Sequence, residues 1–194
     1  MPLVNEFIIC PNDCDTPLAI AVETIDPSCP PAPTQSEIDT LLLMHPTLGV
    51  APADWTVAGA GGWADVIDNS DLTDVKVKQF SVIGSVAEPE RTEVEMPSQT
   101  TVSVIATYTA TFQLRSLPDN IYLYLQKLQC SNIKPKIWYT SLGGYMYGQN
   151  DGIETTSITV NFTKEAGAEA YDGANIIITW RAQTDPQRID NPLA

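Results

Sequence analysis

Few residues of this chain have the side chains that acid–base or nucleophilic catalysis requires. The sequence of 194 residues contains one histidine, His45. His45 precedes Pro46 at the end of a segment that we expect to be helical, where a structural role is the more common one. No nucleophile elbow, phosphate-binding loop or dinucleotide fingerprint occurs in the sequence. We therefore expect no enzymatic activity and no cofactor.

Cysteines are the first group of side chains that could bind a metal ion. Cys10, Cys14 and Cys29 could supply three thiolates to zinc. However, they contain no Cys-x-x-Cys pair, and His45 lies far from them in sequence. Free thiols in packed positions explain these residues more simply, so we assign them no metal.

Aspartates recur at every third position in the segment DVIDNSDLTD. They are Asp65, Asp68, Asp71 and Asp74. Calcium prefers oxygen ligands, but an EF-hand loop places them at every second position around a central glycine. Local turns in which an Asp side chain binds the backbone are the simpler interpretation, and we predict no metal site here either.

Aromatic residues gather around a predicted hairpin, KIWYT-SLGG-YMYG. Trp138, Tyr145 and Tyr147 could form a sugar-binding patch. Burial of these rings in the core or in a subunit interface is the more common outcome on alternating strand positions. A carbohydrate-binding β-sandwich module therefore remains an alternative function.

Charge is distributed unevenly along the chain. The formal net charge is −14, and the first 75 residues contain no Lys or Arg although half of the 24 acidic residues lie there. A protein that grips nucleic acid usually shows a basic patch, and none is visible in this sequence. The acidic balance favours solubility, or a surface to which a polyanion does not adhere.

Residues 1–75 are rich in Pro, Asp, Ala and Gly and predict an extended N-terminal arm. We expect one short helix in it, from Ser36 to Met44, with acidic residues in the first turn. Trp55 and Trp63 are too apolar to remain in water. We therefore expect both to pin the arm to a surface and to contribute to contacts between subunits.

From residue 76 the apolar pattern takes the period of a β-strand. Apolar residues alternate with hydroxyl residues in VSVIATYTATFQL, and similar alternation occurs in TTSITVNF and ANIIITWRA. The segment at about 118–129 instead has the period of an amphipathic helix. The tail TDPQRIDNPLA reads as an extended surface segment. Residues 76–194 therefore predict a mainly β domain, a two-layer sandwich or open barrel with one α-helix packed on one side.

The stretch from Gly84 to Thr101 is longer than a hairpin between its flanking strands requires. It combines two prolines with five charged residues and a few apolar ones. We expect this loop to leave its own domain and contact another subunit. Its candidate contact residues are Val86, Glu88, Glu90, Arg91, Glu93, Val94, Glu95 and Met96.

The order of elements from residue 76 to 192 resembles that of the tail tube proteins of long-tailed bacteriophages and of the related type VI secretion tube protein. The segments that carry the resemblance are the long acidic loop, YTATFQL, SLPDNIYLYLQKL, KIWYTSLGGYMYG and IIITW. The resemblance implies a homo-oligomer in which about six subunits, as in the family, close into each ring, and the rings stack around a lumen. It also implies that the long loop reaches the neighbouring ring and that an acidic lumen would let DNA slide without binding.

The same resemblance implies a structural virion protein that contacts other virion proteins and is assembled in the cytoplasm of the bacterial host. No stretch reaches the roughly 18 apolar residues of a membrane helix, and the N-terminus lacks the basic region of a signal peptide. We therefore expect no membrane partner. A head-decoration or head–tail joining protein is a second virion role that fits the same features.

Overall fold

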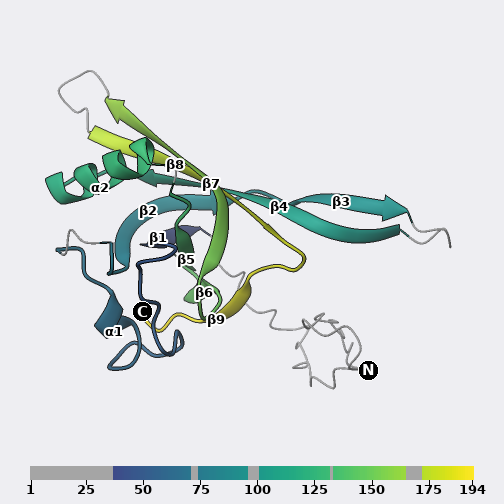
Figure 1. Ribbon diagram of the computed structural model, residues 1–194, viewed down its shortest axis with the longest axis horizontal. Helices are drawn as coiled ribbons and strands as arrows, with labels where there is room; N and C mark the ends of the chain where they lie inside the picture. The colour runs from purple at the N-terminus through teal and green to yellow at the C-terminus, as the bar shows by residue number, and fades with distance from the viewer. Residues whose placement is uncertain (1–36, 71–73, 96–100, 132, 165–171) are drawn as a thin grey trace, which may run out of the picture. The chain divides into compact units, whose positions relative to one another are not determined.

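The computed structural model describes residues 37–70, 74–95, 101–131, 133–164 and 172–194 (Figure 1). All of them belong to one compact unit, Gln35–Ala194. The cysteines Cys10, Cys14 and Cys29 lie outside the described residues, as do Asp71 and Met96.

Strands dominate the described part of the chain. The strands are β1 (Ile38–Met44), β2 (Lys78–Val86), β3 (Glu90–Glu95), β4 (Thr101–Leu114), β5 (Lys136–Ser141), β6 (Tyr145–Gly148), β7 (Ile153–Lys164), β8 (Asp172–Ala182) and β9 (Gln187–Asp190). The helices are α1 (Trp63–Val66) and α2 (Asp119–Cys130). Neither of these two helices is long and apolar enough to cross a membrane.

The strands form a six-stranded antiparallel barrel with three additional strands. The barrel order is β1-β2-β4-β8-β7-β5, and β1 closes it because it pairs with both β2 and β5. β3 extends β4, while β6 and β9 extend β5. The predicted mainly β fold with one substantial helix is confirmed.

The helix predicted from Ser36 to Met44 is wrong, because Ile38–Met44 forms β1. Leu41 and Leu43 point into the barrel core, whereas Leu42 and Met44 pack in a second core on the other side of the strand. A strand that is buried on both faces reads as a continuous apolar run without alternation, and leucine favours helices. β1 lies within the segment that was predicted as an arm, and it pairs with the barrel strands β2 and β5.

The other regular elements lie close to their predicted positions. α2 and the β5–β6 hairpin match the predicted segments, and β4, β7 and β8 show the expected alternation of buried and exposed residues. The C-terminal tail differs from the prediction, because Gln187–Asp190 pairs with β6 as β9.

α2 lies where the barrel wall is incomplete. β5 pairs with β7 only at Lys136 and Ile137, and α2 contacts β7 beyond that point (Figure 1). Leu125 and Leu128 of α2 are buried in the barrel core. The side chain of Gln129 donates a hydrogen bond to the carbonyl of Val160 on β7, at 3.1 Å. The helix thus supplies apolar cover and a backbone partner that a neighbouring strand would otherwise provide.

The segment between β1 and β2 covers the outer face of β1, β5 and β6 and forms the second core. Trp63 is fully buried there and meets Trp138 edge to face, with ring centroids 5.1 Å apart. Its indole nitrogen donates to the carbonyl of Trp55, at 2.8 Å. Trp55 and Trp63 therefore pin this segment to their own domain, as expected. At 5% and 0% exposed, they leave little side-chain surface for the contacts between subunits that were also expected.

Replacing Trp63 with alanine tests this assignment. We expect Trp63→Ala to lower the free energy of unfolding of the monomer by about 3–5 kcal/mol, because it removes a large side chain from a closed core. Chemical denaturation followed by circular dichroism measures the change. The matched substitution Val57→Ala, at a position that is 39% exposed, should cost well under about 1 kcal/mol. Equal stability of both variants would contradict the assignment.

Candidate functional site

A two-stranded extension leaves the barrel at the end of β2. β3 pairs with the first part of β4, from Glu90 opposite Thr107 to Glu95 opposite Thr101. β8 pairs with β4 only from Ala106 onward, so within the described residues this first part of β4 has β3 as its sole partner. We call Glu90–Glu95 and Thr101–Ile105 the hairpin extension. Figure 1 shows it projecting beyond the barrel strands.

The hairpin extension occupies the stretch that was predicted as a long loop. Gly84–Val86 continues β2, only residues 87–89 separate β2 from β3, and β3 then resumes pairing with β4. The prediction of a loop is wrong in its local structure, because Glu90–Glu95 forms a strand. The sequence did not reveal this strand, since five charged residues in and around it remove the apolar alternation of a half-buried strand. The conclusion that this segment leaves the body of its domain agrees with the structure.

The candidate contact residues differ in their surroundings. Val86 is half-buried and packs against the barrel core. Glu88, Glu90 and Arg91 are exposed at the root of the hairpin extension. The remaining candidates within the described residues are Glu93, Val94 and Glu95, which are part of strand β3. Val86 therefore serves the domain itself, whereas Glu88, Glu90 and Arg91 are available to solvent or to a neighbour.

One carboxylate joins β3 of the hairpin extension to the barrel part of β4. The hydroxyl of Tyr108 on β4 donates to Asp185, at 2.5 Å, and the guanidinium of Arg91 on β3 lies 3.6 Å from the same carboxylate oxygen. Burial, and then the hydrogen bond to Asp185, raise the pKa of Tyr108 to about 12. Sequence reasoning missed Asp185, because an Asp before Pro186 in a polar connection carries no signal of such a contact.

The outer face of β2, β4, β8 and β7 carries uncharged side chains in three rows that cross the sheet, and the row beside them pairs Thr107 with the exposed Arg181. Strand register places residues in each row directly opposite one another. The rows are Thr109–Thr179–Ser157, Ser85–Thr111–Ile177–Thr159 and Ile83–Gln113–Asn175–Asn161. We call these rows the uncharged face. It bears hydroxyl and amide groups and two isoleucines, in a chain whose net charge is −14.

Hydroxyl groups on the uncharged face bind one another across strands. Ser157 and Thr179 lie 2.6 Å apart through their hydroxyl oxygens, and Thr156 donates to the carbonyl of Thr179, at 3.0 Å. All of these side chains are exposed or half-buried. The opposite wall of the barrel is covered by the segment that carries Trp63, whereas among the described residues no segment packs over the uncharged face.

The residues considered for catalysis or metal binding have structural partners. His45 follows a strand rather than a helix, and its Nδ1 accepts hydrogen bonds from the backbone amides of Thr47 and Leu48, at 3.2 and 3.1 Å. Asp68 accepts a hydrogen bond from the amide of Ser70, at 2.8 Å, as expected for a local Asp turn. Within the described residues, no group of three potential ligands could hold a metal ion.

The aromatic residues of the β5–β6 hairpin do not form an open sugar platform. Trp138 is fully buried, and its indole nitrogen donates to the carbonyl of Gln149, at 2.7 Å. Tyr147 stacks on Tyr139 at 5.0 Å between centroids. Tyr145 is half-buried, with the guanidinium of Arg188 4.2 Å from its ring centroid. Trp138 is thus unavailable to a ligand, and Tyr145 already has a cation over one face.

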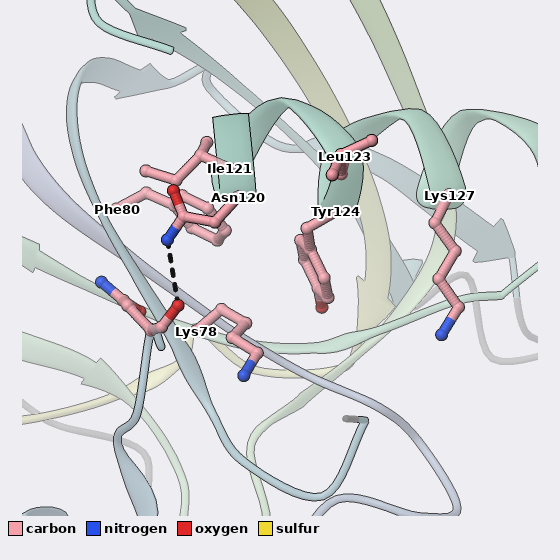
Figure 2. Close-up of a pocket in the computed structure, with 8 residues that line it drawn as sticks. Lys78, Phe80, Asn120, Ile121, Leu123, Tyr124 and Lys127 are labelled. Atoms are coloured by element: carbon pink, nitrogen blue, oxygen red, sulfur yellow. Dashed lines mark hydrogen bonds between the residues drawn. The ribbon is translucent and has the colours of Figure 1, made fainter. Parts of the chain in front are cut away.

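A small hollow lies between α2 and β2 (Figure 2). It has a volume of about 150 Å³ and is lined mainly by apolar atoms, including those of Phe80 and Tyr124. Its polar edges are already paired, because Asn120 donates to the carbonyl of Asn69 at 3.1 Å and Lys127 lies 2.6 Å from Asp74. These contacts attach α2 to the segment before β2 and indicate a structural seam.

No protein-family model matches this chain, and no curated protein sequence matches it. The hairpin extension and the uncharged face are therefore the features from which a function can be inferred.

Removing the hairpin extension should leave the barrel intact. We expect replacement of residues 90–105 by Asn-Gly to change the free energy of unfolding of the monomer by no more than about 1 kcal/mol, because the pairs of β4 with β2 and β8 remain and a shorter loop costs little entropy. Urea denaturation of the two proteins measures the difference. Loss of a cooperative transition would show that the extension is needed by its own barrel.

Proposed function

We propose that this chain is a subunit of the tail tube of a long-tailed bacteriophage. In this proposal, subunits form closed rings, the rings stack, and DNA passes through the lumen. The observation that carries the proposal is the hairpin extension, which stands where the resemblance to tail tube proteins requires a segment that reaches the next ring. The six-stranded barrel with one helix supports the same assignment.

The hairpin extension has the physical properties of a segment that completes its contacts in an assembly. An isolated two-stranded hairpin is marginally stable in water, and the outer edge of a strand presents unpaired amide and carbonyl groups. Glu90 and Arg91 are exposed beside this edge, so a neighbour could pair with charges of both signs. Stacking of a second ring would cover this strand edge and give the exposed charges of Glu90 and Arg91 fixed partners.

The uncharged face suits a surface past which DNA moves. The resemblance implies that the sheets of neighbouring subunits line the lumen, and we assign the β2–β4–β8–β7 sheet to that position. Hydroxyl and amide groups do not attract a polyanion as lysines would, and they do not repel it as carboxylates would. This assignment revises the sequence-based expectation of an acidic lumen, because the acidic residues lie outside the three rows of this face.

Electron microscopy of the purified full-length chain tests the proposed polymer. We expect stacked rings or tubes from the native protein, and monomers or unstacked rings from the variant in which Asn-Gly replaces residues 90–105. Leu123→Ala, on an exposed position of α2, is the matched control and should form normal tubes. Tubes of normal length without the hairpin extension would refute its role, and particles that never stack would favour a decoration or joining protein.

Lysines on the uncharged face test which surface lines the lumen. We expect tubes of the double variant Thr111→Lys, Thr159→Lys to retain short duplex DNA in a salt-dependent manner and to protect it from nuclease. Native tubes should retain none. Leu123→Lys adds a lysine to α2, and DNA bound there should remain sensitive to nuclease. Unprotected DNA on the double variant would place the uncharged face on the outside of the tube.

A further inference from the structure

We propose that Asp185 is a clasp that presets the direction of the hairpin extension before a neighbouring ring binds. Asp185 lies between β8 and β9, and its carboxylate links Arg91 of the extension to Tyr108, which lies on the part of β4 that pairs with β8 in the barrel. The suggestion that the clasp prepares the extension for assembly rests on the proposed function. The contact itself, and its effect on the hairpin extension, belong to the isolated subunit.

The strand ladder is interrupted where the hairpin extension leaves the barrel. Val86 pairs with Ala110 and Glu90 pairs with Thr107, so three residues between them face two on β4. One of the three is Pro89, which has no amide hydrogen to donate. An extra residue of this kind bends a strand and increases its twist. The backbone therefore permits a change of direction at residues 87–89.

β8 also stops supporting β4 at this point. Its pairing with β4 ends at Ala106 opposite Ala182, and the chain then turns away toward β9. Among the described residues, the extension is therefore joined to the barrel by β4, by residues 87–89 and by the side-chain contacts of Asp185. At the root, Glu90 and Arg91 pair with Thr107 and Ala106 of the barrel part of β4, and the amide of Ala87 donates to the carbonyl of Thr109, at 2.8 Å. The side-chain contacts of Asp185 add to these backbone bonds in setting the angle.

The partner of Asp185 on β4 is rigid. Tyr108 is 3% exposed, and its ring lies parallel to that of Trp180, with centroids 5.2 Å apart and an interplanar angle of 3°. Trp180 in turn contacts Tyr139, at 6.2 Å. A ring held in this way presents its hydroxyl group in one direction. Because the pKa of Tyr108 is raised to about 12, the hydroxyl remains a hydrogen-bond donor at physiological pH.

The partner of Asp185 on β3 is exposed. The side chains of Arg91 and Asp185 are 44% and 72% accessible to solvent, and an exposed ion pair at 3.6 Å contributes little stability. The clasp thus combines one firm hydrogen bond with one weak ion pair. Such a contact orders the extension without locking it, and ordering in advance lowers the entropy lost when the next ring binds.

Hydrogen exchange in the full-length chain tests the clasp directly, at a concentration where it is monomeric. We expect Asp185→Ala to raise the exchange rates of the amides in β3 and in residues 101–105 by up to about fivefold, as loss of an exposed ion pair would. The exchange rates of amides in β7, and of those in the part of β8 that pairs with β7, should be unchanged. Asp172→Ala, at the opposite end of β8, removes the same charge and should leave the hairpin extension unaffected.

Two further variants separate the contacts of the clasp. Asp185→Asn retains an acceptor for Tyr108 but loses the charge that attracts Arg91, so a smaller increase is expected. Tyr108→Phe should raise exchange in the extension, and its combination with Asp185→Ala should add little, because both remove one hydrogen bond. Unchanged exchange in Asp185→Ala, or an equal increase throughout the barrel, would overturn the proposal.

The critical concentration for tube formation tests the purpose of the clasp. Asp185→Ala should raise it several-fold, in line with the exchange effect, while the spacing between rings stays the same. An unchanged critical concentration would overturn the assembly role. If neither protein forms tubes but exchange responds as expected, the proposed function fails and the clasp itself stands.

Discussion

The pairing of β1 with two strands is the constraint on which the rest of the structure depends. β2 and β5 both bind the backbone of Ile38–Met44, one along each edge. Leu41 and Leu43 enter the barrel core, and Leu42 and Met44 enter the second core. Full burial of each such side chain contributes on the order of 1.5–3 kcal/mol. The strand therefore closes the barrel and also anchors the segment that carries Trp63.

Closure of the barrel determines which surfaces remain for other molecules. The wall formed by β1 and β5 is covered by the segment between β1 and β2, and α2 fills the gap beside β7. Among the described residues, no segment covers the wall formed by β2, β4, β8 and β7, and its three rows are uncharged. The hairpin extension continues two strands of that same wall beyond the barrel (Figure 1). This wall and the projecting strands are thus parts of one sheet, which links their positions in any assembly.

The candidate site could be predicted from the sequence only in part. The unusual length and charge of the stretch from Gly84 to Thr101 marked it as a segment that leaves its domain. The hydroxyl residues of the uncharged face were visible as the polar half of each alternating strand. Their alignment in rows depends on the register between strands that are distant in sequence, such as Thr111 opposite Ile177. Asp185 meets Tyr108 across 77 positions, and no local pattern records that contact.

The sequence by itself determined the elements that bury one side. β4 and β8 alternate, and α2 repeats with the helical period, because each presents one face to the core and one to solvent. Apart from β9 in the C-terminal tail, two strands escaped prediction, and they did so for opposite reasons. β1 is buried on both faces, which removes alternation from the Leu41–Met44 run, and β3 lies beyond the barrel, where no core selects apolar residues. Only the tertiary structure decided these two, because a residue pattern reports one-sided burial, whereas double burial and projection depend on which distant strands meet.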